Sequence, residues 1–381
     1  MRYIKVAAFI MLILLVLPLS VGATEDSEAW GREYKEMIEA LPEDISGLLP
    51  EKLFSDKVGD IAEGAKEAVS FGYIAEAAVE LLGLKIKEAL KLLSSLMGVL
   101  ILAAVMNSVK SSFSSTGLVS VFSVVVSCSA FLVAVGAQYG IIRSVAEFFS
   151  RLCMFANAFL PLSGALYAMG GNVASAVVHH SSLSIFITVV ENLCGKTVIP
   201  VAGVCIAFAA ANAVAPEIGL GGLAGFFKRS YTTVLGFLMT VFVTVMSAQS
   251  LLASRTDSLS GRAARFAVGN LIPMVGASLS GTLGTVSTGI EYIRGAVGTV
   301  GIATILLMLL PTLITLLLTK LVFSLLTGAA DILGCTAEKK LISELSSING
   351  FLLASAAICS VCFIFILAIF ARCASAAGGG L

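Results

Sequence analysis

The sequence has few charges for its length, and this scarcity decides its class. Only 13% of its 381 residues are charged, whereas 58% are hydrophobic, and the mean hydropathy is +1.00. A soluble globular chain usually carries about 25% charged residues. The composition therefore excludes an ordinary soluble protein and predicts that lipid surrounds most of the chain.

Recognisable catalytic motifs are also absent. There is no Gly-x-x-x-x-Gly-Lys-Ser/Thr loop, no Gly-x-Ser-x-Gly elbow and no His-Glu-x-x-His helix. The two histidines, His179 and His180, are adjacent and have no carboxylate or cysteine at metal-ligand spacing. We therefore expect no enzyme activity, no catalytic residue, no cofactor and no metal, and any transport would draw on a separate ATPase or an ion gradient.

Cysteine is missing from residues 24–91, so we expect no structural disulfide there. Among the eight cysteines further along, Cys359-x-x-Cys362 lies within the apolar run 351–371. No other cysteine or histidine has metal-ligand spacing to this pair. We interpret the two as small apolar residues of a membrane helix rather than as a redox or zinc site.

The first 23 residues have the pattern of a signal peptide. A short positive start, Met1-Arg2-Tyr3-Ile4-Lys5, precedes an apolar stretch over 6–19 and the small residues Val21-Gly22-Ala23. The apolar stretch is shorter than the ~20 residues that a membrane span needs. We predict cleavage after Ala23; the alternative is an uncleaved first transmembrane helix.

Acidic residues are concentrated in the segment that follows, which cleavage would leave outside the cytoplasm. Residues 24–91 contain 16 of the 24 acidic residues against 8 basic ones, which leaves a net charge of −8. Apolar residues recur there at helical spacing, so we predict an exported acidic amphipathic helical region. Because the region is too small for a core of its own, we expect it to lie on the membrane surface or against a partner.

Eight stretches without charge follow and predict an all-α, polytopic transmembrane helical bundle of about six to eight spans. Two of the stretches, around Pro161 and Pro273, are rich in Gly, Ser and Asn and are interpreted as broken helices or re-entrant segments. The eight stretches are 92–109, 118–142, 152–178, 197–215, 231–253, 266–290, 297–319 and 351–371.

The two weak segments resemble each other, which indicates an internal duplication. Phe155-Ala156-Asn157 followed by Pro161-x-x-Gly164-Ala165 recurs, about 112 residues later, as Phe266-Ala267 and Asn270 followed by Pro273-x-x-Gly276-Ala277. We predict two transmembrane helices in 92–149 and repeat units over 150–253 and 262–371. The units are inverted if the weak segments cross the membrane and parallel if they are re-entrant; the alternative is a chance likeness of two Gly/Pro-rich stretches.

Paired interrupted helices at matching positions are a pointer to a translocation path. The candidate path or helix-break residues are Asn157, Pro161, Gly164, Asn270, Pro273 and Gly276.

Basic residues suggest a second contact, although not one with nucleic acid. Arg255, Arg262 and Arg265 form a strip beside the second weak segment, suited to anionic lipid headgroups or to an acidic partner. No basic stripe has interleaved aromatics, so nucleic acid is not expected as a partner.

With eight spans, the basic residues in the loops would divide equally, six on each side of the membrane, so the predicted orientation rests on the signal peptide alone.

Two stretches carry a family resemblance. One runs Ser254-Arg255-Thr256-Asp257-Ser258-Leu259 and continues from Arg262 to Gly276; the other is Phe159-Leu160-Pro161-Leu162-Ser163-Gly164. With these, the chain resembles the stage III sporulation protein AE family of endospore-forming bacteria over nearly its whole length. These stretches have no known chemical role, so the resemblance transfers no catalytic residue.

The resemblance implies a multi-pass protein of the mother-cell membrane around the engulfed forespore. There it would be a channel or transport subunit of a sporulation complex that links mother cell and forespore. A separate ATPase, ring-forming proteins and other stage III membrane proteins are the implied partners. The alternative is a structural scaffold that recruits those members without forming a conduit.

Overall fold

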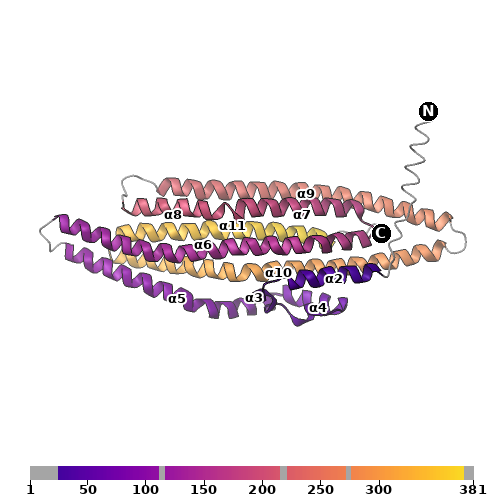
Figure 1. The fold of residues 1–381 in the computed structure, drawn as a ribbon, viewed down its shortest axis with the longest axis horizontal. Helices are drawn as coiled ribbons and strands as arrows, with labels where there is room; N and C mark the ends of the chain where they lie inside the picture. Colours follow the sequence, from indigo (N-terminus) through magenta and orange to yellow (C-terminus); the bar gives the residue numbers. More distant parts are fainter. Residues whose placement is uncertain (1–24, 111–115, 215–220, 272–275, 373–381) are drawn as a thin grey trace, which may run out of the picture.

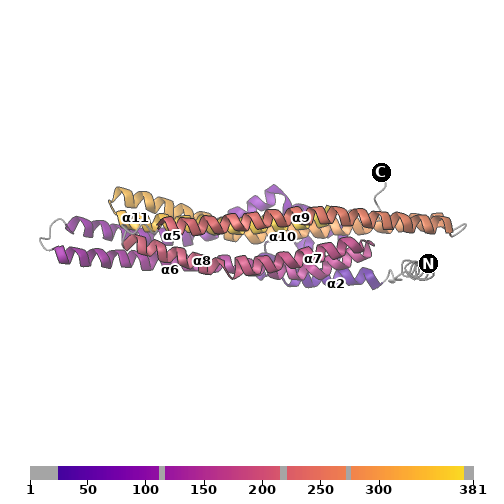
Figure 2. The same ribbon diagram turned by 90° about the horizontal axis from the view of Figure 1, so that it is seen from above.

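The computed structural model describes residues 25–110, 116–214, 221–271 and 276–372, and the regular elements in these ranges are all helices. The long helices lie along one common axis (Figures 1 and 2). They are α5 (Phe71–Lys110), α6 (Thr116–Met169), α7 (Val173–Val189), α8 (Val198–Val214), α9 (Gly221–Leu271), α10 (Gly276–Ile332) and α11 (Thr336–Arg372). The short π-helix η2 (Val190–Gly195) lies between α7 and α8. The predicted all-α architecture is confirmed.

Within the described ranges, six helical stretches are long and apolar enough to cross a membrane. They contain 37 to 47 residues each, which corresponds to roughly 55–70 Å of helix. The hydrocarbon layer of a bilayer is only about 30 Å thick, so each stretch extends well beyond it. The six stretches are Phe71–Ser108, Cys128–Met169, Val173–Asn212, Gly221–Ala264, Val286–Ile332 and Thr336–Arg372.

Successive long helices alternate in direction. The C-terminal ends of α5, α8 and α10 lie at one end of the bundle, which we call the Lys110 end (Figure 1). The last turns of α6 and α9 lie at the other, the Met169 end. The core is formed around α11, which packs against α10, α9, α8 and α6. Its buried side chains between Phe351 and Phe370 recur at helical spacing on one broad face, whereas Val361 and Phe365 on the other side are exposed.

Four short helices precede the bundle and pack onto it. They are α2 (Glu25–Glu39), α3 (Glu43–Ser46), η1 (Glu51–Phe54) and α4 (Val58–Val69). Helix α2 contacts α6, and α4 contacts α10, so that Trp30, Met37 and Ile61 join the common core. Packing against the chain's own helices thus covers part of this region, whereas its contact with the membrane surface or with a partner stays a prediction. The boundary set at 91 falls inside α5, which begins at Phe71.

One hydrogen bond fixes the short helices to one another. The Tyr34 hydroxyl donates to the Leu53 carbonyl at 2.8 Å, joining α2 to η1. Burial raises the pKa of Tyr34, which keeps the phenol in its neutral, donating form.

The helix break expected near Pro161 is not present, because α6 is continuous from Thr116 to Met169. A proline removes one backbone donor, and membrane helices tolerate this where side chains and packing compensate. Here the Asn157 side chain donates to the Cys153 carbonyl at 2.9 Å, and the Ser163 hydroxyl donates to the Leu160 carbonyl at 2.8 Å. The chain turns instead at residues 170–172, where Gly171 has φ +69°. Stretches 118–142 and 152–178 therefore belong largely to one helix.

The two proposed repeat units become helical hairpins with the same direction. Unit 150–253 holds the end of α6, the α7–α8 run and most of α9, and unit 262–371 holds the end of α9, α10 and α11. The α8–α9 and α10–α11 connections both lie at the Lys110 end (Figure 1). This is the geometry of the parallel alternative; the duplication itself stays a prediction.

Candidate functional site

A polar groove lies where α5, α6 and α10 meet. It consists of two adjoining cavities of about 330 and 190 Å³, whose linings share Lys85 and Thr315. Ordinary lipid-facing or core surfaces of a membrane bundle are apolar, so a concentration of polar groups here is informative. The polar residues of the lining are Lys85, Glu88, Ser144, Glu147, Arg151, Thr312, Thr315 and Thr319.

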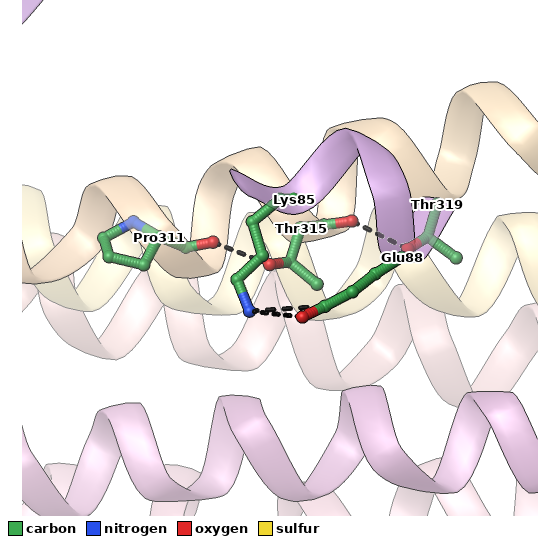
Figure 3. Close-up of polar contacts among 5 residues, drawn as sticks. All are labelled: Lys85, Glu88, Pro311, Thr315 and Thr319. Atoms are coloured by element: carbon green, nitrogen blue, oxygen red, sulfur yellow. Dashed lines mark hydrogen bonds and ion pairs between the residues drawn. The ribbon is translucent and has the colours of Figure 1, made fainter. Parts of the chain in front are cut away.

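Helix α10 contributes a proline and two threonines spaced four residues apart. The Thr315 hydroxyl donates to the Pro311 carbonyl at 2.8 Å, and the Thr319 hydroxyl donates to the Thr315 carbonyl at 2.7 Å (Figure 3). The four-residue spacing places all three on one face of the helix. Because Pro311 has no N–H group, the Leu307 carbonyl lacks its usual helical donor. This face therefore adds polar groups to the apolar stretch of α10 between Val297 and Thr319.

Helix α5 contributes an ion pair across the groove from these threonines. The Lys85 Nζ lies 3.3 Å from both carboxylate oxygens of Glu88 (Figure 3). The pair is partly exposed, at 34% and 67% for the two side chains, so it is only weakly stabilising. Water or a solute can therefore readily replace the contact between the two side chains.

Helix α6 adds charges at the same level of the bundle. Glu147 and Arg151 line the larger cavity with Ser144, and Glu147 also pairs with Arg143 at 3.0 Å. The groove therefore contains charges of both signs from two helices and hydroxyls from two. Such a lining can hold water or a polar solute, but it has no arrangement of nucleophile and base.

The residues predicted to line a path are not part of this groove. Asn157, Pro161 and Gly164 follow one another on α6, and the Asn157 side chain is exposed. Asn270 lies in the last turn of α9 and Gly276 is the first residue of α10, whereas Pro273 lies outside the described residues. Within the described ranges, the candidate residues around Pro161 and those around residue 273 do not form a common site.

The basic strip lies on α9 and encloses a residue with a clear structural role. Arg255 and Arg262 are exposed, and Arg265 follows them on the same helix. Between them the buried Asp257 carboxylate accepts hydrogen bonds from the backbone N–H groups of Ala174 and Ser175, at 2.9 and 2.8 Å. Asp257 thus caps the N-terminus of α7 from another helix.

Sequence reasoning missed the groove because it joins three helices, of which α5 and α10 contribute residues more than 200 positions apart. The local signals are a Lys-x-x-Glu pair in α5 and threonines four and eight residues after Pro311. It also missed that Cys194, within η2, lies 3.2 Å from Cys359, measured between the two sulfur atoms. No group of three or more potential metal ligands is found among the described residues.

The comparisons with known proteins agree on one family. The family described as Stage III sporulation protein AE matches residues 54–376. The Stage III sporulation protein AE of Bacillus subtilis (strain 168) is 23% identical over 290 residues, which cover 75% of this chain and 69% of that protein. No solved structure matches the chain.

Proposed function

Because this chain belongs to the stage III sporulation protein AE family, we propose that it is a channel or transport subunit of the complex linking mother cell and forespore. It is a multi-pass membrane protein involved in stage III sporulation. In this proposal it lies in the mother-cell membrane around the engulfed forespore and is required for forespore development. A separate ATPase, ring-forming proteins and other stage III membrane proteins are its proposed partners.

The groove between α5, α6 and α10 is the observation that carries the transport proposal. A groove with polar and charged walls at the edge of the membrane spans can admit water and a hydrated solute. Here Lys85, Glu88 and Glu147 gather beside a proline-containing helix, next to threonine hydroxyls. A hydrated solute can replace the weak Lys85–Glu88 contact without leaving a buried charge unpaired.

Filling the groove tests this proposal. We expect Thr315→Phe, which places a ring into both cavities, to reduce spore yield to that of a strain lacking the protein. Thr315→Val removes the hydroxyl but keeps the volume, so it should retain spore formation if the space itself matters. Leu317→Phe is the matched control, since Leu317 is 46% exposed on the outer face of the same helix.

Immunoblots of membrane fractions would show that each variant is present at the normal level. Normal spore yield with Thr315→Phe, at normal protein level, would contradict the conduit.

The scaffold is a second candidate, and the continuity of α6 favours it. The break at Pro161 was the reason to expect a path near the Met169 end, and α6 has no such break. The groove-filling variant separates the two functions. A conduit predicts that Thr315→Phe still co-purifies with its partner proteins but yields no spores, whereas a scaffold predicts both intact partners and normal spores.

A further inference from the structure

The first half of α5 has an apolar stripe that the described chain covers only in part. Its members recur at spacings of three, four and four residues, which places them on one face. Another face of the helix packs on the bundle through Ala77, Leu81 and Ala89. The α5 stripe consists of Val79, Leu82, Ile86 and Leu90, exposed by 72%, 43%, 39% and 55%.

Lipid does not explain this exposure, because the segment is too charged for hydrocarbon. Six ionisable side chains occur between residues 76 and 91, and the charge-free part of α5 begins only at Leu92. Such groups are strongly disfavoured inside the bilayer core. The α5 stripe therefore lies outside the hydrocarbon layer, where a contiguous apolar surface marks an interface. The six residues are Glu76, Glu80, Lys85, Lys87, Glu88 and Lys91.

Charges on one flank of the stripe indicate what binds to it. Glu76 and Glu80 are exposed and four residues apart, as are Lys87 and Lys91. Like charges at this spacing repel each other on a helix. None of the four takes part in an ion pair within the described ranges, in contrast to Lys85 and Glu88, which pair on the groove side. A partner with the opposite charges would relieve both repulsions.

We propose that the α5 stripe docks an amphipathic helix of a different membrane protein. That helix has apolar residues facing the stripe, a pair of basic residues opposite Glu76 and Glu80, and a pair of acidic residues opposite Lys87 and Lys91. A straight stripe of about 16 Å suits a helix lying alongside it. The inference requires only that residues 71–91 lie outside the hydrocarbon, and it is independent of whether the groove conducts.

A second copy of this chain does not satisfy the same charges. Two copies in one membrane point in the same direction, so their α5 helices would run parallel. Glu76 and Glu80 would then lie beside the same residues of the other copy, and Lys87 and Lys91 likewise. The like charges would face each other, which is unfavourable.

Site-specific photocrosslinking in sporulating cells tests the docking surface. The photoreactive residue p-benzoylphenylalanine replaces Val79 or Ile86 in the full-length protein. Leu84 is the matched control, since it is 64% exposed but lies about 140° around the helix from Val79. We expect a protein adduct from positions 79 and 86 and none from 84.

Mass spectrometry of the adduct must then locate a helix with paired basic residues. The double change Glu76→Lys and Glu80→Lys, at normal membrane level, should abolish the adduct, and acidic substitutions at the partner's basic pair should restore it. Lipid adducts alone, no adduct, an adduct only with a second copy, equal labelling at 84 or an adduct unaffected by the charge reversal would each overturn the proposal.

Discussion

At Asp257 a single carboxylate joins two helices through residues that are more than 80 positions apart in the sequence. Its two oxygens each accept one backbone N–H of α7, and the side chain is buried. The first N–H groups of a helix have no partner within that helix, so an acceptor from outside satisfies them. The stretch that carries the family resemblance around Ser254–Leu259 thus has a structural explanation at one of its residues.

Replacing this carboxylate should lower stability in proportion to the acceptors lost. We expect Asp257→Ala to reduce the free energy of unfolding by about 1–3 kcal/mol, because two buried donors lose their acceptor. Asp257→Asn should have a smaller effect, since one oxygen remains. Thermal unfolding of the purified protein in detergent measures this, with Thr256→Ala, an exposed neighbour, as control. Equal melting temperatures for the alanine variants at 256 and 257 would contradict the capping role.

At the scale of elements, the α10–α11 pair depends on close approach at small residues. A Cβ atom added to Gly298 would lie 2.6 Å from the Ala371 Cβ, and one added to Gly301 would lie 2.9 Å from a Leu367 methyl carbon. Small residues allow helix backbones in membrane proteins to approach in this way. The close approach fixes the position of α11 at the Met169 end.

A methyl group at this contact should therefore separate the two helices. We expect Gly298→Ala to cost about 1–3 kcal/mol through overpacking. Gly295→Ala is the matched control, because its added Cβ meets nothing within 4 Å and alanine favours a helix by roughly 0.5–1 kcal/mol. Melting temperatures of the two variants give the comparison. A Gly298 variant as stable as the Gly295 variant would show that α11 does not depend on this contact.

Hydropathy and periodicity are local properties of a sequence. They were therefore enough to predict an all-helical membrane protein with six to eight spans and an amphipathic helical region before the first span. They did not predict that α6 continues through Pro161, since the compensating bonds of Asn157 and Ser163 depend on the finished helix. Arg294 lies between the predicted spans 266–290 and 297–319, yet in the fold it is 1% exposed and lies 5.2 Å from the centre of the Tyr167 ring. The groove was missed for the same reason, since Lys85 and Thr315 meet only in the tertiary structure.

For the molecule as a whole, six spans place both ends of the bundle's chain on the same side. The alternation of α5 to α11 brings Lys228-Arg229 and Lys339-Lys340 toward the Lys110 end, where an exported start would put the cytoplasm. The Met169 end would then face outward. Three of the eight predicted spans separate these two pairs, which would put them on opposite sides, whereas the two helices α9 and α10 put them on the same side.

Labelling of single cysteines in a cysteine-free variant tests this topology. We expect a membrane-impermeant maleimide, added to intact vegetative cells that express the protein in their cell membrane, to label Val173→Cys and Leu259→Cys, and Ile332→Cys only after permeabilisation. All three native side chains are exposed, at 66%, 67% and 89%. Labelling of positions 173 and 332 from the same side would contradict the six-span arrangement, and a complete reversal would contradict the orientation given by the signal peptide.

The packing of α4 on α10 also sets an order of events during synthesis. Helix α4 ends at Val69, whereas α10 ends at Ile332, so the ribosome adds more than 260 residues between completing the two. At usual bacterial elongation rates this takes roughly 10–50 s. During that interval the apolar face of α4 that contains Ile61 has not yet met its final neighbour on α10. Helix α4, although made early, is therefore among the last parts to mature, and a nascent chain halted before α10 would present it to proteases and chaperones.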